Sequence, residues 1–249
     1  MRKGRTALTI AFIAAFIGCI AAFVLTRPLV AFVNPGFPEE YMDKLPSSSI
    51  VSTAFRTIRI EESGIGKASP DLAVFHGAGG NPGYDGLSAV YGTDSIDGFD
   101  ILFTLDETEM WKKALALGEK LGLAVLYQED DAYAPGIADS LAEAFPGIML
   151  IPYQGRITDV NIGEIEERLD ANRISIVLMV TPSTSMDIMK RSDLKFVVDF
   201  RDRAAISSRT SYFVAPLWDE AVKKALDGER GKIALDYALF RSDSGLKVR

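Results

Sequence analysis

The stretch that decides the fold is Ile174-Ser175-Ile176-Val177-Leu178-Met179-Val180, which is almost continuously apolar and rich in β-branched side chains. It is too short for a buried helix and is typical of a β-strand covered on both faces. Similar runs lie at residues 29–33, 71–75, 100–105, 123–127, 148–153, 194–200 and 212–215. From residue 100 onward, each pair of runs is separated by a segment long enough for one crossover helix. This alternation predicts an α/β fold of βαβ units with parallel sheets.

Other stretches have weaker patterns. Residues 47–62 follow neither the helical nor the strand period, and residues 77–98 are polar and dotted with glycine. The tail at residues 232–239 alternates apolar and polar side chains, which predicts one edge strand. Trp111 and Trp218 fall on the apolar faces of expected helices, so both are predicted to be core residues.

The N-terminus indicates a membrane segment. Three of the first five residues are basic, and the uncharged stretch that follows runs to Thr26 and ends at Arg27. That stretch is long enough to span a bilayer as a helix and longer than the usual core of a cleaved signal peptide. The flanking charges place the N-terminus in the cytoplasm. We therefore expect a signal anchor over residues 1–27, with residues 7–26 in the cell membrane and the rest of the chain exported to the periplasm. The alternatives are a lipoprotein signal with Cys19 as the lipidated residue and, less favoured, a buried helix of a cytosolic protein.

The overall composition excludes several kinds of partner and site. The net charge is −7 and the pI is about 4.9, which argues against nucleic acid as the main partner because phosphates need basic neutralisation. The single cysteine excludes an intrachain disulfide and a zinc site built from several cysteines. We expect no metal and no cofactor. One group of acids fits the start of a helix better than a metal or glycosidase site, namely Asp106, Glu107 and Glu109.

A glycine-rich loop follows one expected strand, from His76 to Asn81. It resembles the oxyanion-hole loop of α/β-hydrolases, but such an enzyme needs a histidine base elsewhere, and His76 is the only histidine of the chain. The loop also lacks the pattern of a dinucleotide fingerprint or a P-loop. The sequence therefore predicts a protein that is not an enzyme. The loop either offers backbone amides and the side chains of His76 and Asn81 to a ligand, or it only turns the chain.

The order of elements resembles that of the type I periplasmic binding proteins, the solute receptors of ABC importers. The resemblance is carried by residues 123–131 followed by Gly136, by residues 146–155, and by the late turn Leu226-Asp227-Gly228. It covers residues 122–249, which would form the C-terminal α/β lobe, and more loosely residues 28–121, which would form the N-terminal lobe. The N-terminal segment, residues 28–121, is short and irregular for this family. Either that lobe is reduced, or further strands lie in its ambiguous stretches.

The resemblance implies a ligand cleft at the carboxyl ends of the strands. An acid near residue 199 often contacts the ligand in this family, although Asp199 and Arg201 are equally consistent with an internal ion pair. The hydroxyl groups of Thr181 and Ser183 follow the most apolar strand, where they either bind a ligand or cap the next helix. The remaining candidates end neighbouring strands. The expected ligand-binding set is Asp199, Arg201, Thr181, Ser183, Tyr153, Gln154, Asp130, His76 and Asn81.

Two functions follow from these expectations. The first is a membrane-tethered, extracytoplasmic solute-binding protein that captures a sugar, nucleoside or amino acid for an ABC-type importer or a sensor. The second is a degenerate binding-protein-like module with a structural or protein-interaction role at the membrane. A ligand-sized cleft beside Asp199 would favour the first function, and a filled or absent cleft would favour the second.

Overall fold

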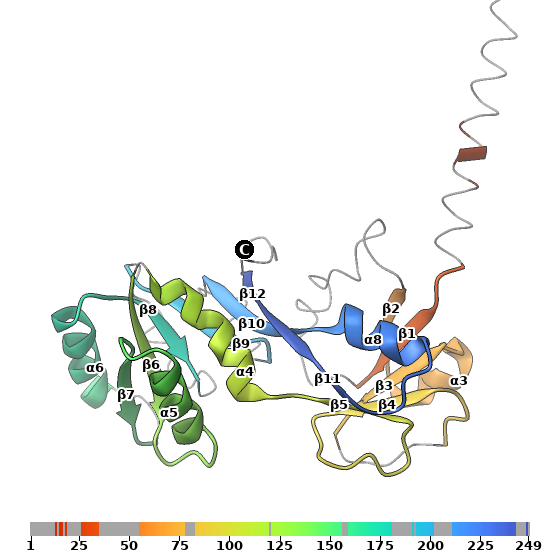
Figure 1. Cartoon of the computed structure of the whole chain (residues 1–249), viewed down its shortest axis with the longest axis horizontal. Helices are drawn as coiled ribbons and strands as arrows, with labels where there is room; N and C mark the ends of the chain where they lie inside the picture. Colours follow the sequence, from red (N-terminus) through yellow and green to blue (C-terminus); the bar gives the residue numbers. More distant parts are fainter. Residues whose placement is uncertain are drawn as a thin grey trace, which may run out of the picture.

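The computed structural model contains two six-stranded sheets that lie side by side as two lobes (Figure 1). It describes residues 13, 15–16, 18, 26–34, 55–77, 83–119, 121–155, 159–180, 191, 193–201, 211–242 and 248. The first sheet has the order β11-β5-β4-β3-β1-β2, and all its neighbours are parallel. Its strands are β1 (Leu29–Val33), β2 (Arg56–Ile60), β3 (Leu72–His76), β4 (Ser88–Tyr91), β5 (Ile101–Thr104) and β11 (Gly231–Ala234).

The second sheet has the order β12-β10-β9-β8-β6-β7. Its neighbours are parallel except for β12, which pairs antiparallel with β10 at the edge. Its strands are β6 (Gly122–Gln128), β7 (Met149–Tyr153), β8 (Ile174–Met179), β9 (Lys195–Asp199), β10 (Tyr212–Leu217) and β12 (Asp236–Arg241). Every apolar run that was expected to be a strand is one, so the predicted α/β class with parallel sheets is confirmed.

The first lobe is more complete than its sequence indicates. Two strands, β2 and β4, lie within the stretches that followed no clear period, so of the two alternatives for this lobe the sheet contains the further strands. The helical cover of this lobe is small. Its helices along residues 55–77 are η2 (Glu62–Gly64) and the single-turn α3 (Ile65–Ala68), and the described residues between β3 and β5 form no helix. Loop side chains take the place of helices here, because Tyr84, Ile96 and Phe99 pack on the buried face of β3 and β4.

Helices cover the second sheet more fully. They are α4 (Glu107–Lys112), η3 (Lys113–Glu119), α5 (Ala134–Ala144) and α6 (Asp159–Ala171). The Asp106 side chain accepts a hydrogen bond from the Glu109 amide at 3.0 Å, which caps α4 as its acid-rich start indicates. Trp111 on α4 is 1% exposed, so its assignment to the core is confirmed.

The chain crosses between the sheets three times. It leaves β5 at residues 105–106, returns from β10 into α8 (Trp218–Leu226), and leaves β11 again at Leu235. The three crossings are adjacent, because Leu217 pairs with Asp236 and the Leu235 amide donates to the Thr104 carbonyl at 3.1 Å. The tail that was expected to form one edge strand is therefore two strands, β11 and β12, in different sheets.

The helix α8 follows the second sheet in sequence but packs on the first (Figure 1). The Trp218 indole is 2% exposed and makes edge-to-face contacts with Phe32, Tyr91 and Phe103, at ring-centroid distances of 5.2, 5.1 and 5.6 Å. Its assignment to the core is thus confirmed. Residues 218–234 complete the first lobe, although the rest of that lobe lies before residue 105.

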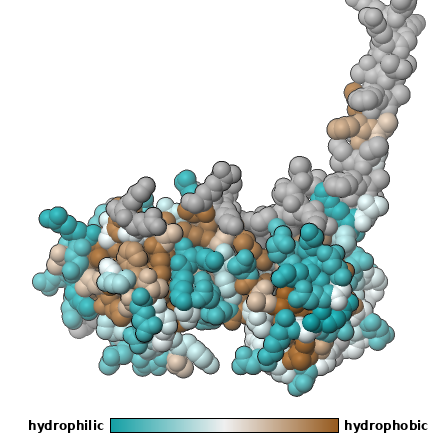
Figure 2. All heavy atoms as spheres, in the orientation of Figure 1, coloured by the Kyte–Doolittle hydropathy of each residue, from teal (hydrophilic) through white to brown (hydrophobic). Residues whose placement is uncertain are grey.

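Apolar side chains lie mainly between the sheets and their covering elements, and hydrophilic side chains dominate the visible face of the first lobe (Figure 2). Within the part of the chain that the structure describes, we find no helix with the length and apolarity that a membrane crossing requires. The predicted span at residues 7–26 lies almost entirely outside that part, since only residues 13, 15, 16, 18 and 26 of it are described.

Candidate functional site

Asp199 and Arg201 form a bidentate pair at the carboxyl end of β9. Asp199 Oδ1 accepts hydrogen bonds from the Arg201 amide at 2.7 Å and from Arg201 Nε at 2.9 Å, and Asp199 Oδ2 accepts one from Arg201 Nη2 at 2.5 Å. The first of these bonds turns the backbone sharply as it leaves the strand, and the other two hold the guanidinium against the carboxylate. Of the two alternatives that the sequence left open for Asp199, the structure contains the internal ion pair.

Arg201 also binds an acid at the first crossing between the sheets. Its Nη2 donates to Glu107 Oε1 at 2.7 Å, and both side chains remain nearly two-fifths exposed. Desolvation acts to lower the pKa of Arg201, but the hydrogen bonds and charges of Asp199 and Glu107 outweigh it and raise that pKa. One cation is thus shared by two carboxylates, and the cluster carries one net negative charge. It ties the end of β9 to the start of α4, the segment by which the chain enters the second lobe.

His76 is the residue of the first lobe on which the charge of this cluster acts. It ends β3, and its ring lies 5.0 Å from that of Tyr91, measured between centroids. Burial and, second to it, the positive charge of Arg201 lower the pKa of His76. The imidazole is therefore neutral at pH 7 and offers one hydrogen-bond donor and one acceptor. Gly92 makes room for it, since a Cβ atom at this position would lie 3.0 Å from the ring.

The space beside the cluster is small. The residues around it leave no room for even a water molecule, and they are Leu105, Asp106, Glu107, Met110, Phe200, Arg201 and Tyr237. Ligand pockets usually enclose roughly 300–1,000 Å³. The hydroxyl of Tyr237 accepts a hydrogen bond from the Asp106 amide, and burial raises the pKa of Tyr237 to about 12. As described, this space accommodates the packing of the crossing segments rather than a whole solute.

A second group of predicted residues lies at the carboxyl ends of β6 and β7. Asp130 Oδ1 accepts a hydrogen bond from the Gly155 amide at 3.3 Å, and Gln154 Nε2 donates to Glu129 Oε2 at 3.3 Å. Hydrogen bonds from Gln128 and from that amide lower the pKa of Asp130. The group is exposed and polar, and it lies on strands that are separated from β9 by β8. Asp130 and Gln154 therefore edge the same lobe as Asp199 without touching it.

The remaining predicted residues divide into two kinds. Tyr153 is 6% exposed and belongs to the hydrophobic core of the second lobe. Thr181, Ser183 and Asn81 lie outside the described residues. From the predicted set, the structure therefore pairs Asp199 with Arg201, and it places His76 where the charge of Arg201 lowers the pKa of the imidazole.

Two residues of the cluster were not among the predicted site residues. Glu107 was expected only to start a helix, and its pairing with Arg201 joins positions 94 residues apart. Tyr237 lay in a tail with a simple strand pattern. A single sequence contains no local signal for either contact. Among the described residues, no three acids, histidines or cysteines lie together in the way that a metal site requires.

Comparison with known proteins identifies the fold. The arabinose-binding protein AraP from Geobacillus stearothermophilus is similar over 88% of this chain and 98% of its own, with 7% identity and a TM-score of 0.54. A periplasmic binding ribose operon repressor protein from Lactobacillus acidophilus matches with 11% identity over 88% and 98% of the two chains (TM-score 0.44). An ABC transporter solute-binding protein from Aeropyrum pernix K1 matches with 11% identity over 86% and 76% (TM-score 0.45).

The likeness to the arabinose-binding protein shows a fold like that of the type I periplasmic binding proteins, with two parallel α/β sheets joined by several crossings. No protein-family model matches the chain, and no curated protein matches it either. The likeness is therefore one of architecture, and the function has to be argued from the residues of this chain.

Proposed function

We propose that this chain is an extracytoplasmic, membrane-tethered receptor that closes its two lobes on a small polar solute, of the sugar, nucleoside or amino acid class, and presents it to an ABC-type permease or a sensor. The observation that carries the proposal is the cluster of Asp199, Arg201 and Glu107 with His76 beside it, at the carboxyl ends of strands from both sheets. Ligands of open α/β sheets bind at this edge. The fold that the chain shares with an arabinose-binding protein supports a solute of this kind.

The crossings between the lobes provide the hinge in this proposal. Three short segments run side by side there, so that a few backbone rotations turn one lobe against the other. Arg201 lies at the hinge and is held by Glu107 and Asp199. A solute whose hydroxyl or carboxylate groups replace Glu107 on the guanidinium would bind one lobe arrangement more tightly than the other. Such a difference in affinity is what shifts the population towards the closed form.

The proposal involves binding and no catalysis. Neutral His76 donates or accepts a hydrogen bond, and no second histidine of the chain is present to act as a base beside it. The acidic balance of the chain supports a small-molecule ligand over nucleic acid, because a net charge of −7 repels phosphates.

The tether belongs to the same proposal. Ile13 and Phe16 lie in the predicted span and are 50% and 60% exposed, so a bilayer would cover side chains that the protein itself leaves uncovered. We propose that residues 7–26 cross the cell membrane and hold the two lobes on its outer side. Lipidation of Cys19 is the alternative form of anchor. Mass spectrometry of the purified chain separates the two anchors. In a lipoprotein the residues before Cys19 are removed and Cys19 carries fatty acids, so both changes alter the mass. A signal anchor keeps residues 1–27 and carries no fatty acid.

One observation favours a second function. The space beside Arg201 has no room for even a water molecule, and the guanidinium is already neutralised by two acids. A module that no longer binds solute, and that contacts another protein at the membrane, would have this kind of closed cluster. Its lobes would keep one arrangement whatever solute is present.

Thermal unfolding of the full chain in detergent, with sugars, nucleosides and amino acids added singly, tests the first function. A ligand present at 100 times its dissociation constant stabilises the native state by about 2.7 kcal/mol. Asp199→Ala and Arg201→Gln should abolish the shift produced by the true solute. Arg191→Gln is the matched control, because Arg191 also pairs with two acids, Asp170 and Asp193, away from the cluster. If no solute stabilises the chain, or if Arg201→Gln binds as well as the native chain, the receptor function is wrong.

A further inference from the structure

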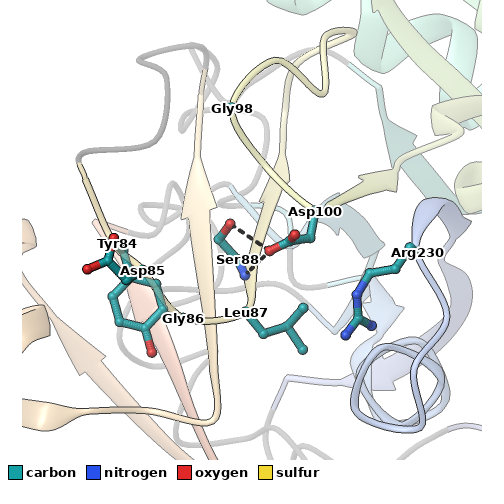
Figure 3. A pocket seen from close by; sticks show the side chains of 8 residues that line it. All are labelled: Tyr84, Asp85, Gly86, Leu87, Ser88, Gly98, Asp100 and Arg230. Atoms are coloured by element: carbon teal, nitrogen blue, oxygen red, sulfur yellow. Dashed lines mark hydrogen bonds between the residues drawn. The ribbon is translucent and has the colours of Figure 1, made fainter.

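A larger cavity lies at the opposite ends of the strands, at the amino edge of the first sheet. It is open to solvent and has a volume of about 370 Å³, which is within the range of ligand pockets. Residues from the loop before β4, from the loop before β5 and from the turn before β11 line it, as Figure 3 shows. They are Tyr84, Asp85, Gly86, Leu87, Ser88, Gly98, Asp100 and Arg230. None of them belongs to the cluster around Arg201.

Asp100 is held firmly in one wall of this cavity. Its Oδ2 accepts hydrogen bonds from the Ser88 amide at 2.9 Å and from the Ser88 hydroxyl at 3.1 Å. Its backbone is fixed as well, because its amide donates to the Ser88 carbonyl and its carbonyl accepts from the Gly231 amide. Asp100 Oδ1 receives no hydrogen bond from the described residues. The carboxylate is thus oriented in advance and has one oxygen left for a ligand.

Arg230 also lines the cavity, and it lies on the same side of the view as Asp100 in Figure 3, with Tyr84 and Asp85 on the other side. Its Nη1 donates to the carbonyls of Ala225 at 3.0 Å and Glu229 at 2.8 Å, which anchors the guanidinium at the end of α8. Nε and Nη2 find no acceptor within the described part of the chain. Nor do Arg230 and Asp100 form an ion pair with one another there, although both line the cavity. Two opposite charges are therefore held apart, each with unused hydrogen-bonding capacity.

We propose that this cavity is a second binding site, for a free basic α-amino acid such as L-lysine. The α-carboxylate binds Arg230, and an ammonium group binds Asp100. Asp85 adds a second acid to the lining, so that the site carries one net negative charge and complements a ligand with one net positive charge. The site lies apart from the proposed solute cleft and does not depend on that function.

Titration calorimetry of the full chain with L-lysine tests the site. Asp100→Asn is the informative variant, because asparagine keeps the oxygen that accepts from Ser88 but loses the charge. We expect this variant to bind L-lysine roughly tenfold to a hundredfold more weakly, as the loss of a hydrogen bond to a charged group predicts. Asp94→Asn, an exposed change in the same loop, should bind as the native chain does. Absence of saturable lysine binding to the native chain, or equal binding by Asp100→Asn, would overturn the proposal.

Two further measurements keep the test independent of folding and of the solute cleft. L-lysinamide lacks the carboxylate that Arg230 binds, so the native chain should bind it at least about tenfold more weakly than L-lysine. Equal binding of the two compounds would contradict the assignment to Arg230. Asp199→Asn should leave lysine binding unchanged. If instead this variant loses lysine binding while Asp100→Asn keeps it, lysine occupies the cleft between the lobes and the second site is refuted.

Discussion

Replacement of Trp218 by alanine tests the topology of the whole molecule, because this residue follows a strand of the second sheet and packs on the first. Its indole is 2% exposed and meets three other aromatic rings edge to face. Removal of a buried tryptophan costs about 3–5 kcal/mol, and each aromatic pair contributes about 0.5–1.5 kcal/mol beyond its buried area. We therefore expect a loss near the upper end of that range, about 5 kcal/mol.

The assay is thermal unfolding of the full chain followed by far-ultraviolet circular dichroism. For a domain of this size, a loss of about 5 kcal/mol lowers the Tm by roughly 10–20 °C. Lys224→Ala is the control, since this exposed residue of the same helix should change the free energy of unfolding by no more than about 0.5 kcal/mol. A loss below about 1 kcal/mol for Trp218→Ala would mean that α8 does not cover β1, β4 and β5, and the crossing at residues 217–218 would be refuted.

Three further predictions concern the hinge and its neighbours. Gly92→Ala should destabilise the protein by about 1–2 kcal/mol in urea unfolding, because φ is +73° and the new Cβ would lie 3.0 Å from the His76 ring, whereas Gly66→Ala, in a helix with open space, should stabilise it slightly. The pKa of His76 is lowered by burial and by Arg201, so the unfolded chain binds a proton more readily. The stability that neutral His76 contributes should then be fully present above about pH 6.5 and should fall as the pH drops from there to the pKa of His76 in the folded protein. His76→Gln should flatten the dependence of Tm on pH in that window. Tyr237→Phe removes the acceptor of the part-buried hydrogen bond from the Asp106 amide at the first crossing and should cost about 1 kcal/mol by the same urea assay, while the exposed Tyr133→Phe should cost nothing measurable.

The sequence predicted the strands whose own residues are mostly apolar. Ile174–Met179 lies between two other strands and under helices, so nearly all its side chains are apolar. The strand Arg56–Ile60 lies at an edge, and most of its side chains are only half-buried. Ser88–Tyr91 is completely buried, but it is short, and it packs on loop side chains and on Trp218 of the distant helix α8. Local patterns of apolar residues therefore failed for these two strands, because their partners come from other parts of the chain.

The candidate site was predicted in part for a similar reason. Asp199 and Arg201 are two residues apart, and their pairing was one of the alternatives that the sequence left open. The contacts of Arg201 with Glu107 and the influence of Arg201 on His76 join three separate strand ends. No local pattern contains such contacts, because they depend on the order of the strands and on the path of the crossings.

The amino-acid sequence by itself determined the class of the fold, the positions of most strands and the burial of both tryptophans. These properties follow from hydrophobic periodicity, which each segment expresses through its own residues. Tertiary structure alone decided that residues 218–234 return to the first lobe, that the tail divides between two sheets, and that one arginine is shared by two acids beside the first crossing. The physical reason is that strand pairing and ion pairing are set by neighbours in space, and Leu235 can continue a strand pattern while its backbone passes from one sheet to the other.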